Sequence, residues 1–119
     1  MSYWDNTVEK IFKLDNRIRS VVITDMNYHT IVSKMRRGFE SLTPLDAEST
    51  LSMIPRIMVE NAQRLEPYLG SIETVSTRYK KAMLVFYRAR EYIVLLSFEP
   101  SVETPFHTKL AKELGRILY

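Results

Sequence analysis

The chain has 119 residues, no cysteine and a net charge of +3, which results from 17 lysines and arginines against 14 aspartates and glutamates. This length predicts a single domain over residues 1–119, and the missing thiols exclude disulfides, cysteine nucleophiles and thiolate metal sites. The small basic surplus permits an anionic partner without requiring one, and a sequence with no signal peptide and no long apolar run predicts a cytoplasmic protein without a membrane span.

A helix and two strands are expected in the first third of the chain. Asn6 and Glu9 have the spacing of a capping box, and the apolar residues that follow predict a helix that runs to Asp15. The stretch Arg17–Thr24 has apolar residues on both faces of a strand, whereas the strand Thr30–Met35 has mixed faces. The polar residues between these two strands are typical of a turn.

A long amphipathic helix is expected in the middle of the chain. Thr43 or Asp46 can cap its start, acidic residues occupy its first turn, and Gly70 ends it. Pro55 removes a backbone hydrogen bond inside this helix and should kink or break it near Met53. One apolar stripe would run along the helix, formed by Leu51, Ile54, Met58, Ala62, Leu65 and Leu69.

Three strands and a final helix follow. The strand Ile72–Tyr79 is largely polar, whereas Ala82–Tyr87 and Tyr92–Phe98 are apolar on both faces. The short links between these strands favour antiparallel hairpins. Thr104 followed by Pro105 predicts the start of an amphipathic helix that runs to the C-terminus. The element order is therefore helix, two strands, helix, three strands, helix.

This order predicts an α+β fold with one five-stranded antiparallel sheet. Strands that are apolar on both faces belong in the centre of a sheet and polar strands at its edges, which leads to the strand order 2-1-5-4-3. The central strands need cover on both faces, so the terminal helices are expected on one face and the middle helix on the other. One helix covers five strands poorly, which predicts a homodimer, unless a kinked middle helix spreads its two halves over the face.

The candidate interaction surface combines the middle helix with the third strand, because this strand is an available edge for strand pairing. Its residues are Leu51, Ile54, Met58, Val75, Thr77 and Tyr79.

A second candidate surface is basic. It consists of Lys34, Arg36, Arg37, Arg78, Lys80, Lys81, Arg88 and Arg90. Tyrosines interleave with these cations, as they do in base-stacking platforms for nucleic acid. In the predicted strand order, however, the cations divide between the two edges of the sheet, and the protection of edge strands from aggregation also explains them. Nucleic-acid binding is therefore the weaker alternative.

No residue pattern in the sequence indicates an enzyme. The three glycines are isolated, which excludes a glycine-rich phosphate loop, and His29 and His107 lack the clustered ligands of a metal site. The carboxylates are typical of helix starts and of solvated helix faces. We therefore expect no catalytic residue, no cofactor and no metal.

The element order and the edge assignment resemble the Roadblock/dynein-light-chain domain, within the profilin-like group of five-stranded folds. The resembling segments are IRSVVITD, TIVSKM, LSMIPRIMVENAQRLEPYLG, AMLVFY and YIVLLSFE. The resemblance implies a non-enzymatic homo- or heterodimer that serves as a scaffold or regulator, often for small Ras-like GTPases. Related five-stranded folds also hold ligands between sheet and helix, so the alternative is a small-ligand sensor with a pocket lined by Phe86, Tyr87 or Phe98.

Overall fold

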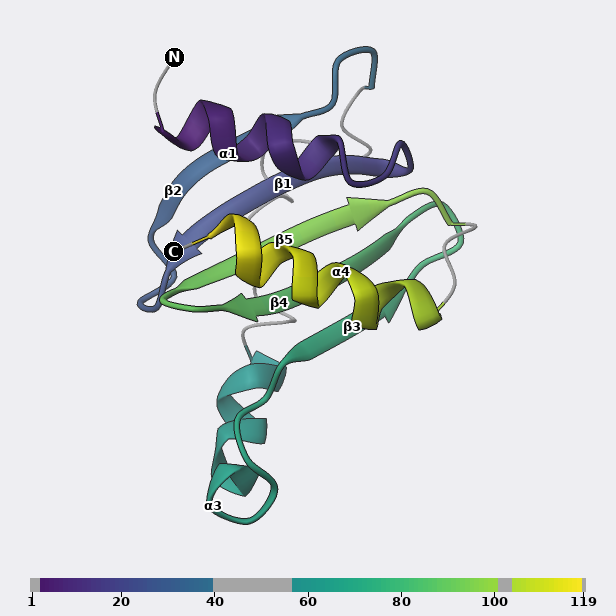
Figure 1. Cartoon of the computed structure of the whole chain (residues 1–119). Helices are drawn as coiled ribbons and strands as arrows, with labels where there is room; N and C mark the ends of the chain where they lie inside the picture. Colours follow the sequence, from purple (N-terminus) through teal and green to yellow (C-terminus); the bar gives the residue numbers. More distant parts are fainter. Residues whose placement is uncertain (1–2, 40–56, 101–103, 119) are drawn as a thin grey trace.

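A five-stranded antiparallel sheet forms the centre of the molecule (Figure 1). The computed structural model describes residues 3–39, 57–100 and 104–118. The strands lie in the order β2-β1-β5-β4-β3, which confirms the predicted order and the α+β fold. The strand bounds are β1 Ile18–Asp25, β2 Thr30–Met35, β3 Thr74–Arg78, β4 Met83–Ala89 and β5 Tyr92–Phe98.

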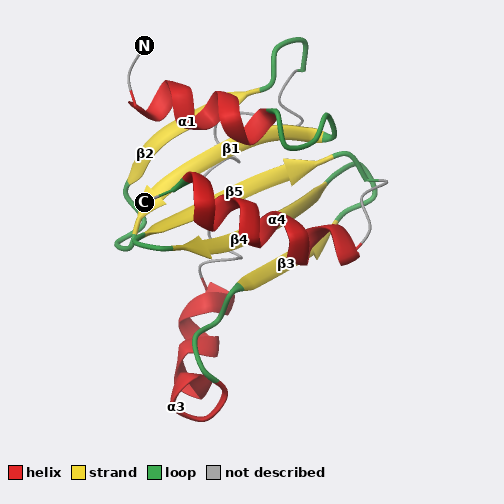
Figure 2. Cartoon of the chain, in the orientation of Figure 1, coloured by secondary structure: helices red, strands yellow, loops and turns green. Residues whose placement is uncertain are grey.

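Two helices cover one face of the sheet, as predicted (Figure 2). α1 (Tyr3–Phe12) contacts β1, α4 (Thr104–Ile117) contacts β4, and the two helices contact each other. Because every second residue of a strand points to the same face, these helices bury alternate residues of the three central strands. The residues of this main core are Val8, Ile11, Phe12, Ile18, Val21, Ile23, Met83, Val85, Tyr87, Ala89, Val94, Leu96, Phe98, Leu110, Leu114 and Leu118. None of the helices in the described ranges has both the length and the apolar character that a membrane span requires.

The first helix begins earlier than the sequence predicted. It starts at Tyr3 rather than at Asn6, and the hydroxyl of Thr7 donates to the carbonyl of Tyr3. Trp4 therefore lies in the first turn, where its ring meets the ring of Tyr92 edge-on with the centroids 4.9 Å apart. The capping prediction at Asn6 was wrong, because Asn6 lies inside α1 and not at its start.

The opposite face carries a smaller apolar cluster. Its buried residues are Val59, Phe86 and Ile93, and partly buried side chains pack against them. Val59 belongs to a helical segment, residues 57–62, so helices contribute to both faces of the sheet. This arrangement confirms the predicted placement of helices on both faces.

The middle helix leaves the sheet after this contact. Beyond the helical residues 57–62, the chain forms a 3-10 turn, Gln63–Leu65, and then the short helix α3 (Glu66–Leu69). Gly70 follows with a φ of 84° and ends the helix, as predicted. The segment extends beyond the β3 edge of the sheet (Figure 1), so its last turns have no strand beneath them. The predicted kink at Pro55 lies outside the described residues.

The predicted apolar stripe is therefore not buried along this segment. Met58, Leu65 and Leu69 are 45%, 52% and 77% exposed, whereas Val59 is buried. The stripe was wrong for two reasons. Within residues 57–62, Val59 rather than Met58 packs on the sheet, and beyond Ala62 the segment leaves the sheet.

Candidate functional site

Exposed apolar side chains lie on the helical segment that extends past β3. The exposed large residues of this segment are Ile57, Met58, Leu65, Tyr68 and Leu69. A soluble chain seldom exposes this many large apolar side chains on one short segment unless a partner covers them. Ile57 and Tyr68 were missed at the level of sequence, because their exposure follows from the departure of the segment from the sheet.

Of the residues predicted for the interaction surface, Met58 lies on the exposed helical segment, and Val75, Thr77 and Tyr79 lie on β3 or directly after it. Tyr79 is 45% exposed, and Val75 and Thr77 are half-buried on the edge strand β3. Leu51 and Ile54 lie outside the described residues. The described part of this surface thus combines an edge strand with the exposed helical segment next to it.

The backbone of β3 presents alternate residues to its outer edge. The carbonyl of Glu73 accepts from the N–H of Arg88 at 3.0 Å, and the N–H of Tyr79 donates to the carbonyl of Ala82 at 2.8 Å. Because backbone groups alternate in an antiparallel ladder, the odd-numbered residues of β3 bond to β4 and the even-numbered residues point their N–H and C=O groups outward. The outward-pointing residues are Thr74, Ser76 and Arg78.

A small cavity lies between β3 and the helical segment. Val59, Phe86 and Ile93 contribute its apolar lining, and its volume is about 130 Å³. A cavity of about 150 Å³ can hold one benzene molecule, whereas pockets for small ligands begin at roughly 300 Å³. The cavity therefore has room for one side chain. Of the residues predicted for a sensor pocket, Phe86 lines this cavity, whereas Tyr87 and Phe98 are buried in the main core on the opposite face.

The rim of this cavity is acidic. Glu60, Glu73 and Arg88 line it together with the apolar residues. The Nη1 atom of Arg88 lies 3.3 Å from Oε1 of Glu66, so a carboxylate outside the rim offsets the charge of Arg88. The rim therefore carries two carboxylates, those of Glu60 and Glu73, and one arginine that is paired with a third carboxylate.

The polar turn between β1 and β2 positions one aromatic ring at this cavity. Asp25 holds the turn, since its Oδ1 accepts from the N–H groups of Asn27 and His29 at 2.8 and 3.0 Å. The bond from the His29 backbone is the main cause that lowers the pKa of Asp25. Tyr28 takes the positive φ of the turn, 65°, and its ring lies 6.4 Å from the ring of Phe86. The turn is thus a structural support for the cavity lining.

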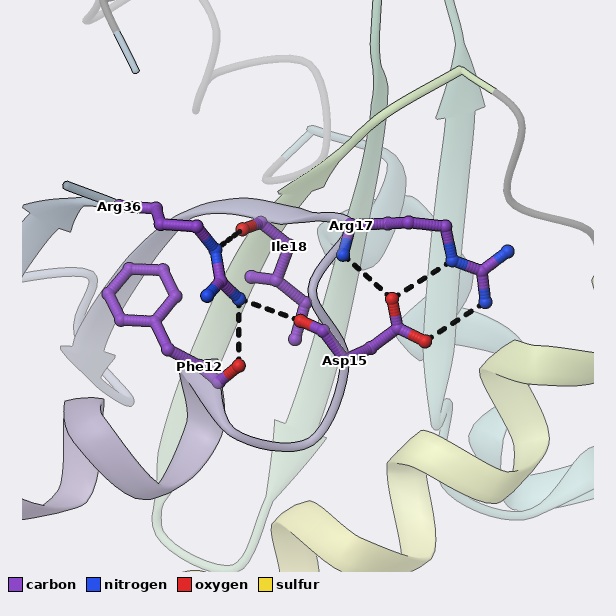
Figure 3. A network of polar contacts seen from close by, with 5 residues as sticks. All are labelled: Phe12, Asp15, Arg17, Ile18 and Arg36. Carbon is purple, nitrogen blue, oxygen red and sulfur yellow. Dashed lines mark hydrogen bonds and ion pairs between the residues drawn. The ribbon is translucent and has the colours of Figure 1, made fainter. Parts of the chain in front are cut away.

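Arg36, predicted as part of a basic surface, binds the backbone instead (Figure 3). Its guanidinium donates to the carbonyls of Phe12, Asp15 and Ile18 at 2.7, 2.7 and 2.6 Å. It also lies over the Phe12 ring, 4.8 Å from the centroid. The Asp15 carboxylate accepts from the side chain of Arg17 at 2.9 Å, and this bond holds the pKa of Asp15 below its usual value. Arg36 therefore joins the end of α1 to the start of β1.

Three more arginines of the predicted basic surface make internal contacts. Arg78 donates to the carbonyl of Pro100 at 2.6 Å, Arg90 donates to the carbonyl of Gly115 near the end of α4 at 2.9 Å, and Arg88 forms the ion pair described above. A cation at a helix C-terminus also stabilises the helix dipole. Arg78, Arg88 and Arg90 are nevertheless exposed. The remaining predicted members, Lys34, Arg37, Lys80 and Lys81, are exposed as well. They lie at opposite edges of the sheet, a distribution that does not favour nucleic-acid binding.

No protein-family model matches the sequence, and no curated protein matches it. Solved structures do match. MglB, a gliding protein of Thermus thermophilus, is 17% identical, with 97% of this chain and 87% of that chain covered and a TM-score of 0.68. A Roadblock/LC7 domain from Streptomyces avermitilis is 8% identical, with 95% and 89% covered and a TM-score of 0.66. The chain has the Roadblock/LC7 fold.

The Roadblock fold agrees with the resemblance that the element order predicted. Profilin IA of Acanthamoeba castellanii is 14% identical, with 97% of this chain and 95% of that chain covered and a TM-score of 0.53, which confirms the profilin-like architecture. A further MglB structure is described as having a tetrameric arrangement, at 17% identity, 95% and 85% coverage and a TM-score of 0.67. At these identities the likeness shows the fold.

Proposed function

We propose that this chain is a dimeric protein-interaction module without catalytic activity, which serves as a scaffold or regulator. The observation that carries the proposal is the β3 edge, whose outward-pointing backbone groups lie next to the exposed apolar residues of the segment 57–69. A second copy of the chain can cover both at once, by strand pairing and by apolar contact. The Roadblock fold and the tetrameric arrangement described for MglB support this proposal.

The partner of the dimer, in this proposal, is a small Ras-like GTPase. The support is the Roadblock fold, because the resemblance to Roadblock domains implies a platform for such GTPases. The alternative is a small-ligand sensor. With a volume of about 130 Å³, the cavity beside β3 is smaller than the roughly 300 Å³ at which ligand pockets begin.

Light scattering over a dilution series tests the dimer. The mass of one chain is 14.0 kDa, and we expect twice this mass at about 50 μM, with dissociation as the chain is diluted. The mass should fall smoothly along one binding curve. A mass of 14.0 kDa throughout the series would contradict the proposed dimer.

Affinity capture with the GDP-bound and the GTP-bound forms of cellular GTPases tests whether the partner is a GTPase. The immobilised chain is incubated with a lysate of its source cells that contains either excess GDP or a non-hydrolysable GTP analogue. We expect a Ras-like GTPase to be retained at least about fivefold more in one state, because a regulator must distinguish the two conformations. Equal retention in both states, or no GTPase in either eluate, would contradict a GTPase partner. This result would not contradict the dimer, which light scattering tests separately.

A further inference from the structure

The acidic cavity described above opens beside the start of β3. Glu73 and Val75 line it from the strand, and Glu60 lines it from the helical segment. Val75 lies opposite Phe86 of β4, so its side chain points to the face of the smaller cluster. Any strand that paired with β3 would therefore bring its own side chains to the mouth of the cavity.

A dimer paired along β3 has one register that uses the whole strand. Opposed residues of an antiparallel pair point to the same face, so odd-numbered residues must oppose odd-numbered ones. Two-fold symmetry places one residue opposite its own copy, and only centring on Ser76 pairs all residues of Thr74–Arg78. In this register the outward-pointing residues form the hydrogen-bonded pairs, and Glu73 lies opposite Tyr79 of the second copy.

The end of β3 carries the charges that complement the acidic rim. Tyr79 and Ala82 close the turn between β3 and β4 through the bond from the Tyr79 N–H to the Ala82 carbonyl. Lys80 and Lys81 form the two central positions of this turn, and both are exposed. The register centred on Ser76 brings the turn of each copy next to Glu73 of the other.

We propose that a second copy completes the cavity: in the dimer, the turn Tyr79–Lys81 of each copy docks against the rim formed by Glu60 and Glu73 of the other. The inference rests on the proposed dimer and adds the residues that determine its register. Tyr79 is 45% exposed and lies on the same face as Val75, and the cavity of about 130 Å³ approaches the size of about 150 Å³ that holds one benzene molecule. The lysines then face the rim carboxylates, which gives the pairing its electrostatic specificity.

A charge swap tests this docking. The dissociation constant of the dimer is measured by analytical ultracentrifugation for Glu73→Lys, for Lys80→Glu with Lys81→Glu, and for the chain that combines all three substitutions. Each reversal should weaken the dimer about tenfold or more, because two-fold symmetry makes the contact occur twice. The combined chain should return to within about threefold of the original dissociation constant, since opposite charges face each other again. Glu9→Lys, at an exposed position on α1, is the matched control and should leave the constant unchanged.

The outcomes separate this docking from the dimer itself. If the original chain dimerises but Glu73→Lys changes its dissociation constant by less than about twofold, or the combined chain remains weak, the docking is wrong and the dimer stands. If the original chain stays monomeric, the proposed function and the docking both fail. Recovery in the combined chain, with weakening in both separate reversals, supports the docking.

Discussion

Replacing Arg36 with methionine should lower the free energy of unfolding by about 2 to 4 kcal/mol. Methionine keeps an apolar stem of similar length but removes the guanidinium, which donates to three backbone carbonyls and lies over the Phe12 ring. One of these carbonyls belongs to the end of α1, where no further turn of helix supplies a donor. A bond to a charged donor contributes more than a neutral one, and water replaces part of the loss because Arg36 is only half-buried.

Urea denaturation at one fixed protein concentration measures this effect. The midpoint should fall by about 1 to 2 M for Arg36→Met. Arg37→Met is the matched control, because Arg37 is the adjacent residue and is exposed, and its midpoint should remain within about 0.3 M of the original. Equal midpoints for the two variants would show that the Arg36 contacts do not stabilise the fold. The fixed concentration is needed because dissociation of a dimer contributes to the transition.

The function of Arg36 was not predictable from the sequence, because its acceptors are main-chain carbonyls. Arg36 follows a strand and precedes a glycine, and no signal in this sequence distinguishes an arginine that binds main-chain carbonyls from one on the surface. Arg90 and Arg78 are equivalent cases, since each donates to a carbonyl that lies at least 20 residues away in the chain. Grouping the cations by charge alone therefore did not separate Arg36, Arg78 and Arg90, which bind main-chain carbonyls, from the other cations.

The strand order, by contrast, was predictable, because burial on both faces is visible in the sequence. β4 and β5 alternate between two apolar sets, one for the main core and one for the smaller cluster, and only central strands can bury both sets. The prediction of a buried stripe on the middle helix was wrong, because its burial is not visible in the sequence. Its burial depends on where the sheet ends beneath it, and no periodicity within the helix contains this information.

The lining of the acidic cavity was predictable from the sequence only in part. Phe86 was predicted to line a pocket, since it is an aromatic residue on a central strand. Glu60 and Glu73 were interpreted as ordinary polar residues of a helix and an edge strand, and they come together only because the helical segment crosses beside β3. Contacts between elements that are distant in the chain determine this site, so the sequence pattern predicted its apolar part alone.

The largest effect on assembly is expected for Ser76→Pro. By the alternation along β3, the Ser76 N–H points to the outer edge and takes no part in the ladder with β4. Proline is tolerated in an edge strand where the lost N–H faces outward, so the fold of the single chain should persist. In a dimer centred on Ser76, however, the substitution removes the central hydrogen bond of both copies and places a ring where the second strand must approach.

We expect Ser76→Pro to weaken the dimer at least about 100-fold, which light scattering would record as a monomer at concentrations where the original chain is dimeric. Ser33→Pro on β2 is the matched control. Because the Arg36 N–H donates to the Arg19 carbonyl, even-numbered residues of β2 bond to β1 and the Ser33 N–H points outward, at the opposite edge of the sheet. Ser33→Pro should therefore remain dimeric. If Ser33→Pro dissociated the dimer and Ser76→Pro did not, the chain would pair through β2, and the β3 interface would be wrong.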